Sequence, residues 1–373
     1  MLSELNLFQF KRFKDEEIDL YPLTLLTGIN GMGKSSVIQS LLTLRQSFDK
    51  GELVQRSQII IDDELTNIVS PDAMLSSSAK NSTVAFSLKD REGNAMRWSM
   101  QAQGTSNTLK AESSESSGDI FKANLFADTF QYLSAERLGP RLVYERSTTR
   151  RYHSPLGYSG EFTADRILSA LTNLDQSSLP TFNGVNKDST VYDELSFWLG
   201  EIVYPGSRVS ANVAGASQIE LTYAFKEERT MVFNPLNVGF GFSYALPVIL
   251  AILIAKKGSL LIVENPEAHL HPKGQSRMGM LLAIAAMNGI QIITETHSDH
   301  VLNGIRMIIK GGTPYGEVAQ GLVKVHFFQR SKDSENGLTE VKRSLDFYSD
   351  GSVSGWPEDF FDEWENSLRF LIQ

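Results

Sequence analysis

The stretch GINGMGKS, residues 28–35, matches the pattern G-x-x-x-x-G-K-[ST] at every specified position. An apolar run at 23–26 precedes it, and residues 35–44 follow with apolar side chains at helical spacing. This order predicts a strand, a phosphate-binding loop and a helix. Glycines let backbone N–H groups and the helix N-terminus point at phosphate oxygens. The stretch therefore predicts a site for a nucleoside triphosphate.

Each polar residue of this loop has an expected role. Lys34 is expected to meet the β- and γ-phosphates, and the Ser35 hydroxyl is expected to bind the Mg²⁺ that bridges them. The residues that we expect to contact ATP are Gly28, Asn30, Gly31, Gly33, Lys34, Ser35 and Ser36. The expected ligands are thus ATP and Mg²⁺.

Two further apolar strands are expected to end in polar residues at the same sheet edge. Residues 259–263 run into Glu264 in VENPEAHLHP, and 291–294 run into ETHS, which contains His297. Ligands of open parallel sheets bind at the carboxyl ends of the strands. We expect Glu264 to bind Mg²⁺ and His297 to contact the γ-phosphate, whereas His269 and His271 have the pattern of structural residues.

A second glycine-rich loop, NVGFGFS at 237–243, precedes a predicted helix at 244–256. Ser243 is expected to be its N-cap, with Pro247 in its first turn. Gly241 and Ser243 then form a second anion site, which one chain cannot easily bring to its own triphosphate. This predicts a homodimer in which each chain contributes its second loop to the partner's nucleotide; a plain helix cap is the alternative.

Composition narrows the classes of function. The chain has 373 residues, 41% of them hydrophobic, and its net charge is −9 from 35 Lys and Arg against 44 Asp and Glu. Overall charge therefore does not favour nonspecific nucleic-acid binding. Absence of cysteine excludes disulfides, thiolate metal sites and a thiol nucleophile. With no evident secretory signal, and a longest apolar stretch (245–255) well short of the ~20 residues of a membrane span, we expect a cytoplasmic protein without a membrane partner.

The remaining patterns outline four regions. Alternating residues at 4–10 and 18–20 predict two strands, 83–88 and 96–103 a hairpin, and 130–134 another strand, whereas 105–117 is expected to be exposed. Helical patterns at 164–174 and 192–203 predict an inserted, mainly helical lobe. A further hairpin is expected at 322–329 and 338–342. The predicted regions are 1–145, 146–230, 231–312 and 313–373.

Several segments together resemble one group of ATPases. The N-terminal LNLFQFKRFKDEEIDLYPLTLLTGINGMGKSS, the VENPEAHLHP segment and THSDH are similar to ABC-type ATPases of the SMC, RecF and OLD group. YLSAERLGPR, GYSGEF, NVGFGFSYALP and GWPEDFFDE resemble a branch of bacterial AAA-family ATPases with a C-terminal domain of unknown function. The resemblance implies an α/β fold: an ABC/SMC-like P-loop ATPase head with a mixed sheet, an added antiparallel β region and an inserted helical lobe.

The resemblance also implies roles for individual residues. It places Walker A at 28–35, Walker B at Glu264, a signature-like loop at 239–243 and a switch histidine at His297. Group members commonly carry a second acid where this chain has Asn265. Because asparagine cannot take up a proton, either Glu264 or Glu267 must serve as the base, or hydrolysis is slow.

Three functions are compatible with these features. The first is an ATP-dependent dimeric switch that controls a separately encoded effector, such as a nuclease, in prokaryotic anti-phage defence. The second is a DNA-repair ATPase that contacts nucleic acid through the arginines of 137–151, namely Arg137, Arg141, Arg146, Arg150 and Arg151. The third is a nucleotide-stabilised scaffold. In the first, the C-terminal aromatic residues Trp356, Phe360, Phe361 and Trp364 are expected to anchor the partner.

Overall fold

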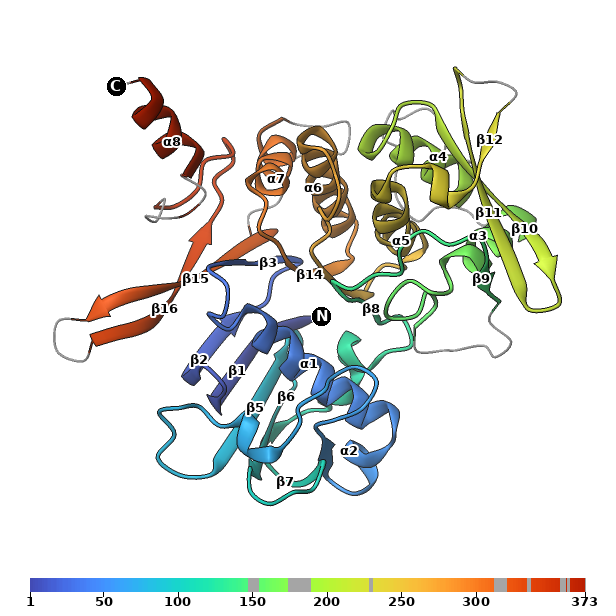
Figure 1. The fold of residues 1–373 in the computed structure, drawn as a ribbon. Helices are drawn as coiled ribbons and strands as arrows, with labels where there is room; N and C mark the ends of the chain where they lie inside the picture. Colours follow the sequence, from blue (N-terminus) through green and yellow to red (C-terminus); the bar gives the residue numbers. More distant parts are fainter. Residues whose placement is uncertain are drawn as a thin grey trace.

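The computed structural model describes residues 1–146, 154–173, 189–227, 231–311, 321–333, 337–355, 360 and 363–372. Its centre is a six-stranded sheet in the order β16-β15-β3-β14-β13-β8 (Figure 1). The strands are β3 (Leu23–Gly28), β8 (Gln131–Leu133), β13 (Leu260–Glu264), β14 (Gln291–Glu295), β15 (Val323–Asp333) and β16 (Gly337–Asp346). All neighbours pair in parallel except β16, which pairs antiparallel with β15. β14 thus lies between the strand of the phosphate loop and the strand of Glu264.

A second sheet is antiparallel and has the order β2-β1-β5-β6-β7-β4. Its strands are β1 (Leu2–Phe10), β2 (Phe13–Asp19), β4 (Gln58–Ile60), β5 (Thr83–Asp90), β6 (Ala95–Gln101) and β7 (Thr108–Ser117). Helix α1 (Lys34–Asp49) shares a hydrophobic core with both sheets, and α2 (Glu52–Gln55) follows it. The expectation that 105–117 is only exposed chain is wrong, because β7 buries Leu109 and Ala111 in this core.

Three helices cover the other face of the parallel sheet (Figure 1). They are α5 (Phe240–Ile254), α6 (Pro272–Met287) and α7 (Asp299–Gly311). The parallel sheet has a hydrophobic core on each face, and successive side chains of β13 point to opposite faces. Leu261 therefore belongs to the core with these helices, whereas Ile262 belongs to the core with α1. The sequence predicts a buried helix at 244–256, and the structure has α5 there, although it begins earlier, at Phe240, and ends at Ile254.

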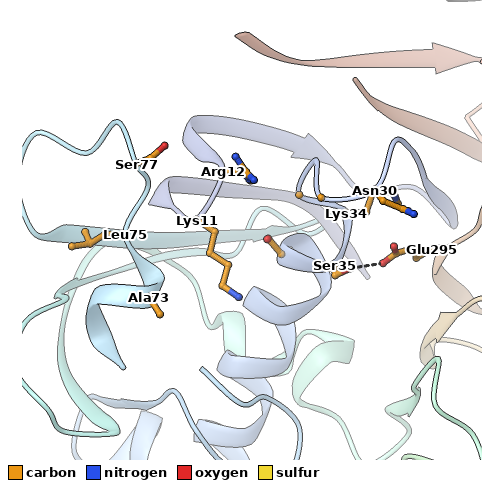
Figure 2. A pocket seen from close by; sticks show the side chains of 12 residues that line it. Lys11, Arg12, Asn30, Lys34, Ser35, Ala73, Leu75, Ser77 and Glu295 are labelled. Atoms are coloured by element: carbon orange, nitrogen blue, oxygen red, sulfur yellow. Dashed lines mark hydrogen bonds between the residues drawn. The ribbon is translucent and has the colours of Figure 1, made fainter. Parts of the chain in front are cut away.

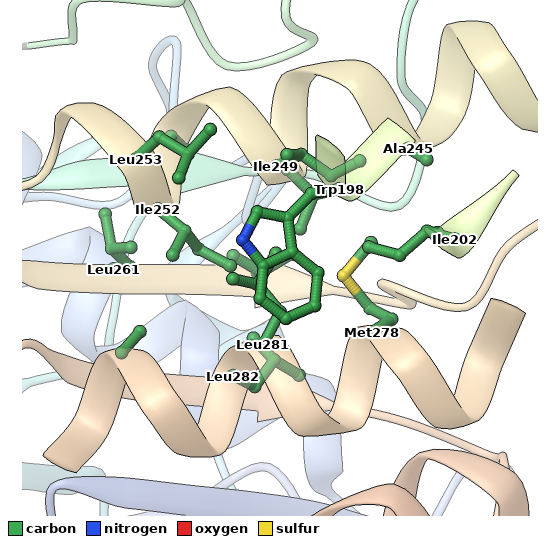
Figure 3. Close-up of a cluster of buried hydrophobic side chains, with 14 of the residues drawn as sticks. Trp198, Ile202, Ala245, Ile249, Ile252, Leu253, Leu261, Met278, Leu281 and Leu282 are labelled. Carbon is green, nitrogen blue, oxygen red and sulfur yellow. The ribbon is translucent and has the colours of Figure 1, made fainter. Parts of the chain in front are cut away.

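The inserted region is mixed rather than mainly helical. It contains α3 (Thr163–Asn173) and α4 (Val191–Ile202), but also a long hairpin of β10 (Ser207–Gly215) and β11 (Gln218–Phe225). Short β9 (Tyr144–Glu145) and β12 (Val232–Phe233) both pair with β11. Trp198 of α4 packs between α5 and α6 (Figure 3), so this region shares a core with the ATPase sheet.

The C-terminal hairpin is present, but it is not separate from the ATPase sheet. β15 pairs in parallel with β3, and the chain then ends in α8 (Glu363–Ile372). Phe360 is fully buried against Phe327, with ring centroids 5.0 Å apart, so its proposed role as a partner anchor is wrong. Trp356, Phe361 and the side chain of Trp364 lie outside the described residues.

Short 3₁₀ helices in the described chain cover Pro71–Met74, Ile120–Lys122, Asn124–Phe126 and Pro235–Asn237. None of the helices among the described residues is long and apolar enough to cross a membrane.

Candidate nucleotide-binding site

The phosphate loop joins the end of β3 to the start of α1 in a conformation that requires glycine. Gly28, Gly31 and Gly33 have φ values of 122°, 77° and 106°. A Cβ atom on Gly28 would lie 2.1 Å from the carbonyl oxygen of Phe328, and one on Gly33 would lie 2.6 Å from Phe13 Cζ. These two positions therefore admit no side chain.

A pocket of about 450 Å³ opens in front of this loop (Figure 2). Its size is within the usual range for small-molecule sites. It is lined by Lys11, Arg12, Asn30, Gly31, Gly33, Lys34, Ser35, Ser36, Ala73, Leu75, Ser77 and Glu295. Six of these are expected nucleotide contacts, whereas the β1–β2 turn and the segment 73–77 form a wall that the sequence did not indicate.

Lys34 lies at the base of the pocket. Its Nζ donates to the carbonyl oxygens of Gly28 at 2.8 Å and Ile29 at 2.9 Å. These bonds use two of its three N–H donors, which leaves one for a phosphate oxygen. Burial lowers the pKa of Lys34, and the negative charge of Glu295 acts in the opposite direction.

Glu295 is a site residue that the sequence interpretation missed. The Ser35 hydroxyl donates to Glu295 Oε2 at 3.0 Å, and the Glu295 side chain lines the pocket (Figure 2). Burial raises the pKa of Glu295, and the charges of Glu264 and Glu267 raise it further. The signal for this residue was present, because Glu295 ends an apolar strand just as Glu264 does.

Glu264 and Glu295 are direct partners in the sheet, but their surroundings differ. Glu264 Oε1 accepts a hydrogen bond from Tyr132 Oη at 2.9 Å, and Oε2 accepts one from the backbone N of Ala135 at 3.3 Å. Burial and the charge of Glu264 raise the pKa of Tyr132, which keeps the phenol a neutral donor. Glu264 is therefore held from the β8 side, one strand further from the phosphate loop than Glu295.

Glu267 and His297 are also brought together. The backbone N of His297 donates to Glu267 Oε1 at 2.9 Å, while Glu267 Oε2 is buried and has no hydrogen-bond partner in the described part of the chain. Burial raises the pKa of Glu267. His297 Nε2 lies 3.9 Å from Glu295 Oε1, and burial followed by the charge of Lys34 lowers the pKa of His297. The lowered pKa favours a neutral imidazole beside Glu295, although His297 itself does not line the pocket.

Comparison with known families identifies the chain. The profile of a family described as "AAA domain, putative AbiEii toxin, Type IV TA system" matches residues 23–303, which is more than half of the chain. The chain belongs to this AAA family. A second profile, "Protein of unknown function (DUF3696)", matches residues 319–371. A search of curated proteins gave no significant match.

Solved structures show the fold of this AAA-family ATPase. An Smc head bound to the C-terminal winged-helix domain of ScpA is 14% identical, with a TM-score of 0.50, over 92% of this chain and 97% of that one. An Smc head with an extended coiled coil, bound to the C-terminal domain of ScpA from Pyrococcus furiosus, is 12% identical, with a TM-score of 0.52, over 100% and 99%. These matches confirm the expected SMC/ABC-like P-loop ATPase head.

The signature-like loop of this ATPase differs from the expectation. Helix α5 begins at Phe240 with Gly239 as N-cap, so Ser243 is not the cap, and Pro247 lies in the helix interior rather than in its first turn. Ser243 is buried. Neither Gly241 nor Ser243 lines the pocket in front of the phosphate loop of the same chain.

Arg137 has a structural role inside the site. It is 3% exposed and donates to the carbonyl oxygens of Glu264 and Asn265, each at 2.6 Å. Its inclusion in a nucleic-acid surface is therefore wrong, because the guanidinium is buried under the loop that follows β13. Arg146 lies 3.7 Å from Asp165, and Arg150 and Arg151 lie outside the described residues.

The donor atoms beside the phosphate loop suit Mg²⁺. The Ser35 hydroxyl and the Glu295 carboxylate are hard oxygen ligands, already within hydrogen-bond distance of each other. In the described residues no cluster of three or more His, Asp or Glu side chains could hold a metal alone. This fits an ion whose other ligands are phosphates and water.

Proposed function

We propose that the pocket in front of the phosphate loop binds Mg²⁺-ATP and that the chain hydrolyses it. The observation that carries this proposal is the hydrogen bond between Ser35 and Glu295 beside the Lys34 ammonium. Lys34 binds the β- and γ-phosphates, and Ser35 and Glu295 hold the ion. When bound, Mg²⁺ neutralises developing charge on the transferred phosphoryl group.

In this proposal Glu264 accepts the proton of the attacking water. Asn265 cannot do so, and its backbone N instead donates to the carbonyl oxygen of Glu295 at 2.8 Å, which ties the ends of β13 and β14 together. Tyr132 and Ala135 orient the Glu264 carboxylate. Glu267 fixes the backbone of His297, whose neutral ring then faces the γ-phosphate.

We also propose that two chains close around the nucleotide. Gly239 is exposed, no described side chain caps α5, and the N–H groups of its first turn can therefore bind an anion. Because this helix end does not line the pocket of its own chain, a second chain is the source of a phosphate for it. Leu236 and Phe240, which flank Gly239 in the chain, are more than half exposed, which favours a protein contact there.

The closed dimer is proposed to control a separately encoded effector in anti-phage defence. The family description names a toxin of a toxin–antitoxin system, which supports a function exercised together with a second protein. Direct action on DNA is the alternative, but Arg137 is buried and cannot contact nucleic acid. A nucleotide-stabilised scaffold is the other alternative, since Asn265 removes the usual second acid.

Two measurements test this proposal. Light scattering with ATP, ADP or no nucleotide reports the dimer, and the rate of phosphate release reports turnover. We expect a dimer only with ATP, turnover above the Lys34→Ala background, and a longer-lived dimer for Glu264→Gln because its base is lost. A protein that stays monomeric with ATP at micromolar concentration would contradict the gating. Turnover equal to that of Lys34→Ala would favour the scaffold, and salt-dependent DNA binding by the purified chain would favour action on DNA.

A further inference from the structure

A second pocket, of about 440 Å³, lies at the amino ends of β8 and β13, away from the nucleotide pocket. It is bordered by Ile254 at the C-terminal end of α5, by Gln131 at the start of β8 and by Leu261 near the start of β13. The nucleotide pocket is lined by Glu295, which ends β14, so the two pockets lie near opposite ends of the parallel strands. This pocket is therefore distinct from the site described above.

The floor of this pocket is apolar and its rim is charged. Phe130, Ala251 and Leu261 line it and are each about 1% exposed. Phe130 belongs to the core around α1, whereas Ala251 and Leu261 belong to the core around α5. The cavity thus lies at the edge strand β8, where the two cores meet.

The charged rim has a positive balance. Lys256 and Arg166 border the opening together with one acid, Asp128. Arg166 also donates to Ser169 Oγ at 3.2 Å. Lys256 is exposed at the end of α5 and forms no ion pair with the described residues. A site of this size with an apolar floor and a cationic rim suits an apolar molecule that carries one anionic group.

We infer that this pocket binds a small amphipathic anion and that this small-molecule effector, distinct from the effector protein above, regulates the ATPase. Three of its borders belong to elements that carry residues of the proposed function. Helix α5 has 15 residues, about 22 Å, and begins at the signature-like loop. β13 (Leu260–Glu264) carries Leu261 near one end and Glu264 at the other, and β8 carries Tyr132, the donor to Glu264. The effector role rests on the proposed function, whereas binding to the pocket does not.

Fluorescence titration with 1-anilinonaphthalene-8-sulfonate, an apolar anion, tests binding without nucleotide. We expect one site per chain. Lys256→Gln should weaken binding about threefold to fivefold, as expected for loss of one exposed ion pair. Lys257→Gln is the matched control, since it removes the same charge from the neighbouring exposed residue, which does not line the pocket, and should bind like the wild type. Ile254→Trp should fill the pocket and abolish binding.

Several outcomes would overturn the inference. They are no saturable binding by the wild type, equal affinities for the two lysine variants, displacement of the probe by ATP in competition for one site, or wild-type binding by a folded Ile254→Trp. If thermal melting shows that Ile254→Trp is unfolded, the lysine pair decides. For the effector role, the probe's affinity should change when Mg²⁺-ATP is added to the wild type but not to Lys34→Ala. An unchanged affinity in both would remove the effector role and leave the binding site.

Discussion

Two glycine-rich loops precede helices in this chain, and Gly28 in one and Gly239 in the other meet different constraints. In the phosphate loop, Gly28 has φ 122° and no space for a Cβ atom. In the signature-like loop, Gly239 has φ −64°, a value open to any residue, and a Cβ atom there would meet nothing within 4 Å beyond its chain neighbours. The fold of the chain itself requires the first glycine but not the second.

The difference indicates where the second constraint arises. We propose that Gly239, which its own fold does not require, permits close approach of the partner's nucleotide. In this proposal the phosphate loop binds the nucleotide of its own chain, whereas the signature-like loop binds the nucleotide of a second chain. Substitutions in and around the two loops test this contrast.

The largest effect is expected for Gly28→Ala. The new methyl group would overlap the Phe328 carbonyl and occupy a strained φ, so the free energy of unfolding should fall by more than about 3 kcal/mol in urea denaturation. Gly93→Ala is the matched control, because Gly93 also has positive φ, 86°, but open space around it. Its cost should be about 1–2 kcal/mol. An equal loss of unfolding free energy in the two variants would show that Phe328 moves to accommodate the new methyl group.

Acid is expected to destabilise the fold at β15, the strand whose Phe328 carbonyl faces Gly28. The residue responsible is His326, two residues before Phe328 on β15. His326 is fully buried, with Nε2 2.8 Å from the Asp19 carbonyl oxygen and Nδ1 3.0 Å from Ser344 Oγ. A neutral ring satisfies both, donating from Nε2 and accepting at Nδ1. Burial lowers the pKa of His326 to about 4.

Because the unfolded chain takes up this proton near pH 6.5, stability is complete above that pH and is lost as the pH falls toward 4. We expect a loss of about 2 kcal/mol between pH 7.5 and pH 5 in urea denaturation. His326→Gln should lower stability at pH 7.5 but show a smaller loss on acidification. An identical pH dependence in both proteins would assign it to other groups.

Smaller effects are expected for Glu295→Gln and Glu264→Gln, and the two substitutions should change different properties of the enzyme. Glu295→Gln should raise the Mg²⁺ concentration needed for half-maximal turnover about tenfold, because a ligand beside Ser35 loses its charge. Glu264→Gln should lower turnover at saturating Mg²⁺ instead. Since burial raises the pKa of Glu295, the neutral variant should also melt slightly higher without nucleotide. Reversed effects would exchange the two roles.

The smallest effect on folding is expected for Gly239→Ala. Stability should stay within about 0.5 kcal/mol of the wild type, because the added methyl group meets no atom of the chain. ATP-dependent dimerisation, measured by light scattering, should weaken several-fold. A dimer of unchanged affinity would mean that the partner's nucleotide does not approach this glycine.

Some features followed from sequence because they depend on neighbouring residues. GINGMGKS predicted the turn from β3 into α1, and alternating or helical apolar patterns predicted the β5–β6 and C-terminal hairpins, α3, α4 and the buried helix at 245–255. The apolar strand before Glu264 was equally visible. In each case local backbone preference and burial on one face point to the same element.

Other expectations failed where a short segment fits two local structures. Gly239 is the N-cap of α5 and Gly241 lies in its first turn, and because glycine is a poor helix former the sequence predicts a helix that begins at 244, four residues after the observed start at Phe240. The serine- and glutamate-rich chain of β7 has little apolar signal, and only pairing with β4 and β6 makes it a strand. The terminal aromatic cluster suggested a docking surface until Phe360 was found in the core.

Sequence by itself determined that this chain is built around a phosphate loop, with an acid at the end of one apolar strand and a histidine after another, because those patterns are local and each has few structural solutions. Only the tertiary structure decided which acid meets Ser35. Glu295 is 260 residues from Ser35 along the chain, and the two meet because β14 pairs directly with β3, while Glu264 lies one strand further away beside Tyr132. Strand order is set by packing across the whole molecule, and no short segment encodes it.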